Sequence, residues 1–420
     1  MSCIPINDFS LITLCDATKA GKLYSIVPDS GAGDLDVVRA STATYLGADG
    51  LIKTAANNEP RIEFNADGSY KGLLVEPAAT KLVLRSQEFD NAAWNKVNSS
   101  VTANDAVAPD GTTTADKLVE NAGTGSKTLD KPNISVSSGA IYTVSFFAKK
   151  SQRHFLQISM FAPEFGINAF GNFNLALGVL GSLGSDSTAT IRDFGNGWFL
   201  CSLTSTAITS SSTSGFSARL VTSATSVRAE SYTGDGTSGF FIWGAQIEES
   251  PVATSYIPTV ASTVTRAADV ITKTGISSLI GQTEGTVYAE VVVNDLSSQL
   301  YSLYQGVNNE IRVIVASTGI LTAQYRDGVG TGQIVLSPSL TFPFTAKIVQ
   351  TYQDNTTDGH KLYVNGVLVG TANTGAMPNP IADIFVGRRG NNTSFANAHI
   401  KAFALLPTAL TDEQAIQLTS

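Results

Sequence analysis

The sequence predicts an all-β protein of two antiparallel β-sandwiches, with a small N-terminal β-rich region and one short C-terminal helix. Apolar and polar residues alternate with a period of two along most of the chain, and turn residues recur about every 8–12 positions. Charged residues make up 15% of the 420 residues, against about 25% in average soluble proteins. This low charge content excludes long helices rich in Lys and Glu, and an apolar content of 43% excludes general disorder.

The first 82 residues are expected to form a small region of their own. Short strand candidates lie between Gly, Asp and Asn turns at Leu23–Val27, Val37–Ala40, Arg61–Phe64 and Leu73–Val75. Their apolar runs are too short to build a large core. We therefore expect segment 1–82 to pack on a neighbour or to fold within an assembly.

Segment 83–258 is predicted to be the first sandwich. Gly195–Gly197 has the composition of a tight turn and leads into the predicted strand Trp198–Ser205. The other expected strands are Ala140–Lys149, His154–Met160, Asn168–Asn174 and Gly239–Glu248.

Segment 259–420 is predicted to be the second sandwich. The dipeptide Asn365-Gly366 favours the positive φ angles of a two-residue hairpin turn. Helical spacing is confined to Leu410–Leu418, where Thr411 and Gln414 have the spacing of a capping box. The expected strands are Thr286–Asn294, Leu300–Tyr304, Ile311–Ala316, Leu321–Tyr325, Thr345–Tyr352, Lys361–Val364, Val367–Gly370, Ile384–Gly387 and His399–Leu405.

Charge and cysteine content exclude several classes of function. The formal net charge is −8 and no run of basic residues occurs, so we expect no nucleic-acid partner. Cys3, Cys15 and Cys201 are isolated and are expected to stay reduced. We expect no signal peptide and no insertion into a membrane, because the apolar runs are short.

The inventory of reactive residues favours a protein that is not an enzyme. No G-x-S-x-G motif occurs, and His154, His360 and His399 are each expected to be half-exposed strand residues. No spacing of His or Cys suits a metal, so no catalytic residue, metal ligand or cofactor is predicted. A single structural Ca²⁺ held by Asp and backbone carbonyls has no clean sequence motif and stays open.

Glycoside hydrolysis is the enzymatic alternative, because it needs two facing carboxylates. The one E-x-D sequence in the chain is Glu88-Phe89-Asp90, and Ala93 stands where a further Glu would complete the pattern. Glu248 and Glu249 are adjacent and would point to opposite faces of a strand. A glycan depolymerase therefore stays a minor alternative.

Sugar binding without chemistry requires less, because exposed aromatic side chains together with Asn, Asp and Arg suit a sugar, and the second sandwich offers such residues. The candidate ligand-binding residues are Arg388, Arg389, Asn391 and Asn392 in a donor-rich loop, with Tyr304 and Tyr325 on predicted strands. Both tyrosines alternate with apolar residues, so either side chain is expected to be able to face outward.

An ordered set of motifs resembles bacteriophage virion proteins, chiefly tail-fibre and related surface proteins. The motifs are Val38–Tyr45, Asp49–Ile52, Glu59–Ile62, Gly72–Pro77 and Lys81–Asp90 with Trp94. The following part is similar to a carbohydrate-binding-module-like jelly roll at Ala108–Thr112, Ala115–Leu118, Phe241–Glu248 and Ser255–Thr259. In the last third, Lys361–Gly366 and Phe385–Arg388 resemble concanavalin A-like, laminin-G-like domains.

The resemblance implies a virion surface protein, made in the host bacterial cytoplasm and released by lysis. Segment 1–82 would then be the virion-attachment region, 83–258 the jelly roll and 259–420 the concanavalin A-like sandwich. The implied partners are other virion proteins, further copies of the chain in a dimer or trimer, and host cell-surface glycans. Many tail fibres have helical stalks, and none is predicted here, so a capsid decoration, head-fibre or collar/tail connector protein that binds no sugar is the alternative.

Overall fold

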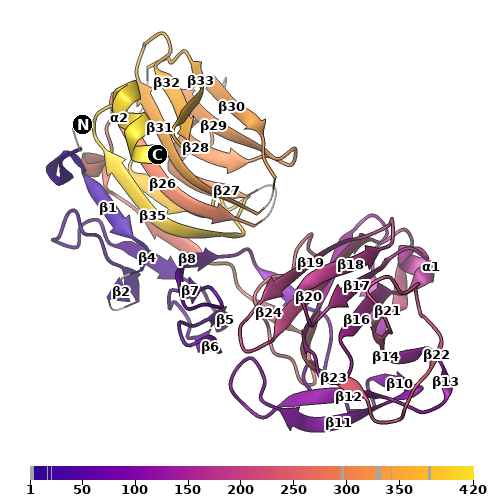
Figure 1. Ribbon diagram of the computed structural model, residues 1–420. Coiled ribbons are helices and arrows are strands. Elements are labelled where there is room, and N and C mark those ends of the chain that lie inside the picture. The colour runs from indigo at the N-terminus through magenta and orange to yellow at the C-terminus, as the bar shows by residue number, and fades with distance from the viewer. Residues whose placement is uncertain are drawn as a thin grey trace.

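The computed structural model describes residues 4–16, 18–19, 21–294, 298–327, 333–341, 343–376 and 380–420. The chain is all-β, as predicted, and forms two antiparallel β-sandwiches that Figure 1 shows as separate bodies. The short helices are η1 (Ile6–Asp8), α1 (Ala162–Phe165), η2 (Ser277–Leu279) and the C-terminal α2 (Asp412–Thr419). None of the helices in these ranges is long and apolar enough to cross a membrane.

The first sandwich consists of two sheets, each with six strands among the described residues. In spatial order, one sheet contains β10 (Asn95–Val97), β14 (Lys127–Val136), β21 (Ser211–Leu220), β16 (Phe155–Met160), β17 (Phe170–Asn174) and β18 (Val179–Leu183). The other contains β11 (Ser99–Ala106), β12 (Ala115–Glu120), β23 (Gly239–Glu248), β15 (Ile141–Lys149), β20 (Phe199–Thr206) and β19 (Thr188–Asp193). A short pair, β13 (Thr124–Gly125) and β22 (Tyr232–Thr233), lies beside them.

A group of contacting aromatic rings lies within the core of the first sandwich. Trp94 contacts Phe89, Phe146 and Phe216, with ring centroids 5.0–6.3 Å apart. Its indole Nε1 donates a hydrogen bond to the carbonyl oxygen of Arg85 at 3.0 Å. The motif Lys81–Asp90 with Trp94 therefore closes one end of this core.

The second sandwich is built of two larger sheets. The eight-stranded sheet contains β33 (Val367–Ala372), β32 (His360–Val364), β31 (Phe344–Gln353), β26 (Glu284–Val293), β35 (Ala398–Leu406), β8 (Tyr70–Val75) and β7 (Ile62–Phe64), with β1 (Leu11–Leu14) also paired to β35. The sheet with nine described strands contains β2 (Thr18–Lys19), β3 (Lys22–Leu23), β4 (Leu35–Val38), β25 (Val270–Lys273), β34 (Asp383–Val386), β27 (Gln299–Gly306), β28 (Asn309–Val315), β29 (Ile320–Asp327) and β30 (Gln333–Ser339).

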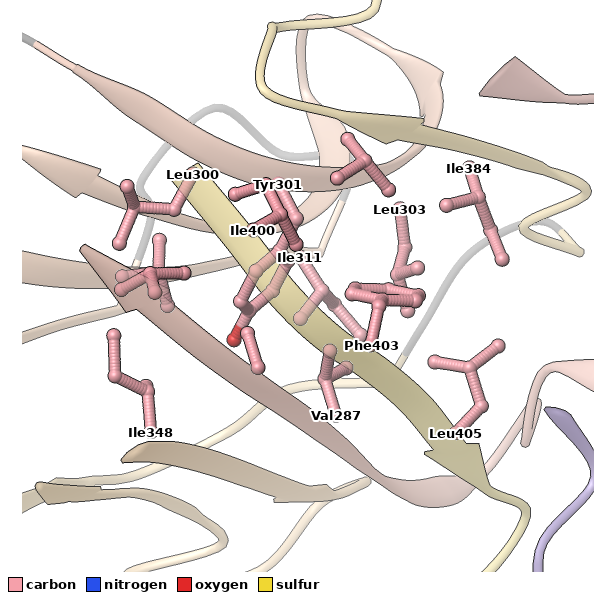
Figure 2. Packing of buried hydrophobic residues seen from close by; sticks show 14 of the residues in the cluster. Val287, Leu300, Tyr301, Leu303, Ile311, Ile348, Ile384, Ile400, Phe403 and Leu405 are labelled. Atoms are coloured by element: carbon pink, nitrogen blue, oxygen red, sulfur yellow. The ribbon is translucent and has the colours of Figure 1, made fainter. Parts of the chain in front are cut away.

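Alternating side chains from these two sheets form one apolar core. Figure 2 shows Leu300, Tyr301, Leu303 and Ile311 of the nine-stranded sheet packed near Val287, Ile348, Ile400, Phe403 and Leu405 of the eight-stranded sheet. Helix α2 covers the outside of β31–β33. Its predicted capping box is present, since Thr411 Oγ1 accepts from the Gln414 N–H and Gln414 Oε1 accepts from the Thr411 N–H.

The N-terminal segment does not form a region apart from the sandwiches, contrary to the expectation for residues 1–82. Strands β1 and β8 both pair with β35, and β4 pairs with β25. In Figure 1 the indigo N-terminal strands run beside the yellow strand β35. The apolar runs of this segment are too short for a separate core, and its residues Leu11, Leu35 and Val75 are buried in the core of the second sandwich instead.

The two chain segments that connect the sandwiches pair with each other. Strand β9 (Ala79–Lys81) lies on the outgoing connection, β24 (Val264–Arg266) lies on the returning one, and the two are antiparallel. A small hairpin of β5 (Ala43–Leu46) and β6 (Ile52–Ala55) lies nearby in Figure 1.

A buried cluster of charges, here called the junction cluster, lies at these connections. It consists of Arg39, Arg61, Arg266, Glu76 and Asp269, whose side chains are at most 3% exposed. Arg39 bonds to Asp269 at 2.9 Å, and Arg61 bonds to Glu76 at 2.7 Å and also to Asp269. Burial alone would raise the pKa of Glu76, but Arg266 and Arg61 hold it at about 2.

The junction cluster explains several of the motifs that gave the family resemblance. Arg39 belongs to the motif Val38–Tyr45, Arg61 to Glu59–Ile62 and Glu76 to Gly72–Pro77. Ser255, from the motif Ser255–Thr259, donates its backbone and side-chain hydrogen bonds to Glu76 at 2.7 Å each. These residues hold the connection between the sandwiches, which makes their role in this chain architectural.

Candidate functional site

The predicted donor-rich loop folds back onto its own sheet. Arg389 makes a two-pronged ion pair with Glu310, with Nε 2.9 Å from Oε2. Arg388 is 7% exposed, and its guanidinium lies over the ring of Phe385. Asn391 Oδ1 accepts from the backbone N–H and the hydroxyl of Thr393, which forms a local turn.

Of the remaining predicted ligand residues, Asn392 and Tyr304 are accessible and Tyr325 is not. Asn392 is exposed and has a positive φ of 61° in the turn. Tyr304 is half-buried, with its ring beside Gly390 of the loop. Tyr325 is fully buried and donates a hydrogen bond to Asp354 at 2.6 Å. Its assignment to an outward-facing site is therefore wrong, because its register places it with the core-facing Ile311.

The structure also contains a cleft of about 430 Å³ between the two sandwiches, here called the junction cleft. Strands β19 and β20 line it from the first sandwich, the connection at 252–255 closes one side, and strands β7, β8 and β35 line it from the second. Its apolar lining is aliphatic and includes Leu74, Ile191 and Leu200. Its polar lining includes Glu63, Arg192, Ser202, Asn294, Asn397 and His399.

A hydrogen-bonded chain of buried groups forms one wall of the junction cleft. His399 Nε2 donates to Glu63 Oε2 at 2.6 Å, and Lys71 Nζ donates to the same oxygen at 3.0 Å. On the other side of the ring, the Asn294 amide lies 3.4 Å from His399 Nδ1 and 3.4 Å from Asn397 Oδ1. This chain holds Asn294 and Asn397 at the cleft in defined orientations.

The ionisation of this wall follows from its burial and its partners. Burial lowers the pKa of His399 below its usual value, against the attraction of Glu63. Burial works to raise the pKa of Glu63, but the hydrogen bond from His399 and the charge of Lys71 outweigh it and hold the pKa well below its usual range. At neutral pH the wall therefore contains a carboxylate at Glu63 and a neutral imidazole at His399.

We expect the ring of His399 to stay neutral, with its proton on Nε2, as the pH falls below the ordinary histidine pKa of 6.5. Protonation would place a positive charge in a buried site, so the folded state resists it. Histidine ¹⁵N NMR spectra recorded between pH 7.5 and 5.5 measure both the tautomer and the charge. A His399 ring that gains a second proton near pH 6.5 would contradict this assignment.

Two of the three histidines differ from the sequence expectation of half-exposed strand residues. His399 and His360 are both fully buried, whereas His154 is exposed. Burial lowers the pKa of His360 to about 3, and its Nε2 lies 2.8 Å from the amide nitrogen of Gln350. Each buried ring has a polar partner on another strand. The alternation of apolar and polar residues along a single strand does not reveal such a partner.

Metal and thiol chemistry have no evident site in the part of the chain that the structure describes. Within those ranges, no three His, Cys, Asp or Glu side chains are grouped so that they could hold a metal ion. Cys15 and Cys201 are buried free thiols, and burial raises the pKa of Cys15 to about 12. Cys3 lies outside the described residues.

Comparisons with known proteins find similarity in structure only. No family model matches the sequence, and no curated protein sequence matches it. The CBM40 domain of the Ruminococcus gnavus IT-sialidase is 15% identical, with a TM-score of 0.30 over 36% of this chain and 98% of that one. Domain 4 of AbnA, a GH43 extracellular arabinanase from Geobacillus stearothermophilus, is 13% identical, with a TM-score of 0.30 over 41% and 84%. A heptameric SAP-like pentraxin from Limulus polyphemus is 15% identical, with a TM-score of 0.27 over 33% and 70%.

Proposed function

We propose that the chain is a surface protein of a bacteriophage particle that adheres weakly and multivalently to host glycans, and that the junction cleft holds the sugar. The virion assignment rests on the ordered motifs between Val38 and Trp94. The observation that carries the binding function is the cleft itself, whose volume of about 430 Å³ lies within the range of ligand pockets, roughly 300–1,000 Å³.

The lining of the junction cleft suits a sugar ring. Hydroxyl groups of a sugar both donate and accept hydrogen bonds, and the amides of Asn294 and Asn397 offer both functions. The guanidinium of Arg192 adds further donors. Leu74 and Leu200 provide an apolar surface for the C–H faces of the ring. Such a cleft would select among sugars by the hydrogen bonds of its polar side chains, and its aliphatic side chains would exclude water from the bound ring.

Multivalency supplies the strength that a single cleft of this kind lacks. We expect a dissociation constant of about 1 µM to 1 mM for one cleft, equivalent to roughly −8 to −4 kcal/mol. Display of many copies on a particle raises the avidity by about 10²–10⁴. The proposed attachment of the chain to other virion proteins would provide that display.

The protonation states at the cleft support a binding function over hydrolysis. Glu63 and Glu76 both line the cleft, but a glycosidase needs one protonated carboxylic acid to protonate the leaving oxygen. Partners hold the pKa of Glu63 well below its usual value and that of Glu76 at about 2. Both groups are carboxylates at neutral pH, so neither has the protonation state of a general acid.

We expect an antibody raised against residues 280–420 to label intact particles at the tip of the tail. Electron microscopy of immunogold-labelled particles measures the position, with antibody preadsorbed on the purified chain as the control. Label over the capsid or at the neck would instead favour the alternative role as a decoration, head-fibre or connector protein. Absence of label from all particles would contradict the virion assignment.

A further inference from the structure

Four arginines gather on the outer face of the nine-stranded sheet of the second sandwich. Along β27 and β28, the side chains of Leu303 and Ile311 point into the core, so the alternating Glu310 and Arg312 lie on the opposite face. Arg326 is paired with Glu310 in the sheet, and Arg388 and Arg389 come from the loop that follows β34. We call Arg312, Arg326, Arg388 and Arg389 the arginine cluster.

One carboxylate faces most of this positive charge. Glu310 is fully buried and lies within 3.5 Å of Arg312 and Arg326, and it forms the two-pronged ion pair with Arg389. Asp383 lies on the same face, on the neighbouring strand β34, where its carboxylate also accepts a hydrogen bond from the backbone of Gly275. Among the described residues, four arginines against Glu310 and Asp383 leave an excess of two positive charges, in a chain whose net charge is −8.

The arginines are poorly solvated and are held in place by bonds within the sheet, since Arg312 donates to Gln324 at 2.7 Å and Arg326 donates to the carbonyl oxygen of Val307 at 3.0 Å. The side chains of Arg312, Arg389 and Arg326 are 9%, 15% and 24% exposed. Burial lowers the pKa of Arg312 to about 10, and repulsion from Arg389 and Arg326 adds to that effect despite Glu310. The Nε of Arg388 is buried and has no hydrogen-bond partner among the described residues. Guanidinium groups that are held in place and partly desolvated in this way are common partners of carboxylate, sulfate and phosphate groups.

We propose that the arginine cluster binds an anionic group, a carboxylate or a sulfate or phosphate ester, carried by an acidic surface polysaccharide. The anion site follows from the charge imbalance, while its polysaccharide source rests on the proposed adhesion function. His399 and the junction cleft lie at the other sheet of this sandwich, because His399 alternates with the core residue Ile400 on β35. The two sites are therefore separate, and one polymer would have to pass around the sandwich to reach both.

Binding of three immobilised polymers at 150 mM NaCl tests the proposal: polygalacturonate, dextran sulfate and neutral dextran. We expect the full chain to bind at least one acidic polymer and not neutral dextran. Arg312→Gln and Arg326→Gln should each weaken that binding about tenfold, since each removes one charge-assisted contact. Lys401→Gln is the matched control, because it removes one positive charge from the opposite face, where Lys401 pairs with Glu290.

The outcome separates this inference from the proposed function. Equal binding of the wild type and both arginine variants would overturn the arginine cluster as the site, as would the absence of binding to both acidic polymers. Arg326 is the most exposed of the three, so Arg326→Gln keeps the test informative if Arg312→Gln fails to fold. A variant that blocks the junction cleft should bind the acidic polymers as the wild type does, so the sugar site and the anion site fail independently.

Discussion

Replacing Asp269 with asparagine is expected to lower the free energy of unfolding of the second sandwich by about 3–5 kcal/mol. The substitution keeps the shape of the side chain and removes its charge. Asp269 Oδ1 accepts from Arg39, and Oδ2 accepts from Arg61 and from the backbone N–H of Glu76 at 3.0 Å. Asp269 is the carboxylate that faces Arg39, so its loss leaves a fully buried guanidinium without an acidic partner among the described residues.

The exposed ion pair between Lys22 and Asp36 provides the matched control. Its side chains are 47% and 42% exposed and 2.7 Å apart. Asp36→Asn should leave the free energy of unfolding nearly unchanged, because water screens such an exposed pair. Urea denaturation followed by tryptophan fluorescence and by circular dichroism measures both variants. Equal, small effects of the two substitutions would show that the junction cluster does not stabilise the fold.

The position of the junction cluster also predicts where the damage appears. Trp94, Trp198 and Trp243 all belong to the first sandwich, so tryptophan fluorescence reports on that sandwich and on the hairpin residues Leu46 and Ile52, which share a cluster with Trp198 and Trp243. Circular dichroism reports on both sandwiches. We expect Asp269→Asn to shift the circular dichroism transition more than the fluorescence transition, because Arg39 and Asp269 adjoin β4 and β25 of the second sandwich.

Local sequence signals were sufficient to predict those turns, caps and strands that depend on residues close to one another in the sequence. The capping box of Thr411 and Gln414 begins α2 as predicted, and Asn365-Gly366 forms the hairpin turn between β32 and β33 with positive φ at both residues. The strand expected at Ala140–Lys149 is β15 (Ile141–Lys149). Alternation along these strands was clear because one face of each sheet is buried in a core.

Strand β14 could not be predicted from the alternation of apolar and polar residues. It runs from Lys127 to Val136 and was not predicted, because it contains Pro132 and two lysines. Both Lys127 and Lys131 are nevertheless buried, with their ammonium groups over the rings of Tyr232 and Trp94. The aromatic partners that make this burial tolerable come from distant parts of the sequence, Tyr232 from β22 and Trp94 from the bend before β10, so the local sequence carries no sign of them.

The candidate site depends on contacts between distant segments, which the sequence alone did not reveal. Glu63 and His399 are 336 residues apart and meet because β7, β8 and β35 are neighbours in one sheet. A charged residue between the apolar Ile62 and Phe64 was the available signal that this short strand has a polar function. The donor-rich loop was recognised from composition, but its partner Glu310 was not, and this partner turns the loop back onto the sheet.

Blocking the junction cleft is expected to abolish binding to uncharged glycans, which is the larger of the two functional effects expected here. Thr190 is exposed on β19 and lines the cleft, so Thr190→Trp places an indole in the space proposed for the sugar. Thr188 lies on the same face of the same strand and is also exposed, but it lines a different, shallow depression. Thr188→Trp is therefore a control of the same chemistry outside the cleft.

A second variant tests the hydrogen bonds of the junction cleft without filling its space. Asn397→Leu keeps a side chain of similar volume and removes the amide that we propose binds a sugar hydroxyl. It should weaken binding of the responsive glycan by at least about tenfold, because a buried sugar hydroxyl would lose its partner. Thermal unfolding of all three variants checks that each is folded before binding is compared.

A glycan array tests the junction cleft as the sugar site most directly. It is probed with the full chain coupled to a multivalent carrier, as wild type, Thr190→Trp, Thr188→Trp and Asn397→Leu. We expect the wild type and Thr188→Trp to bind the same glycans, Thr190→Trp to bind none of the uncharged ones, and Asn397→Leu to bind the uncharged ones weakly. Equal binding of the uncharged glycans by the two tryptophan variants would contradict the cleft as the sugar site. Failure of the multivalent wild type to bind any bacterial surface glycan would contradict the adhesion function and leave the purely structural role.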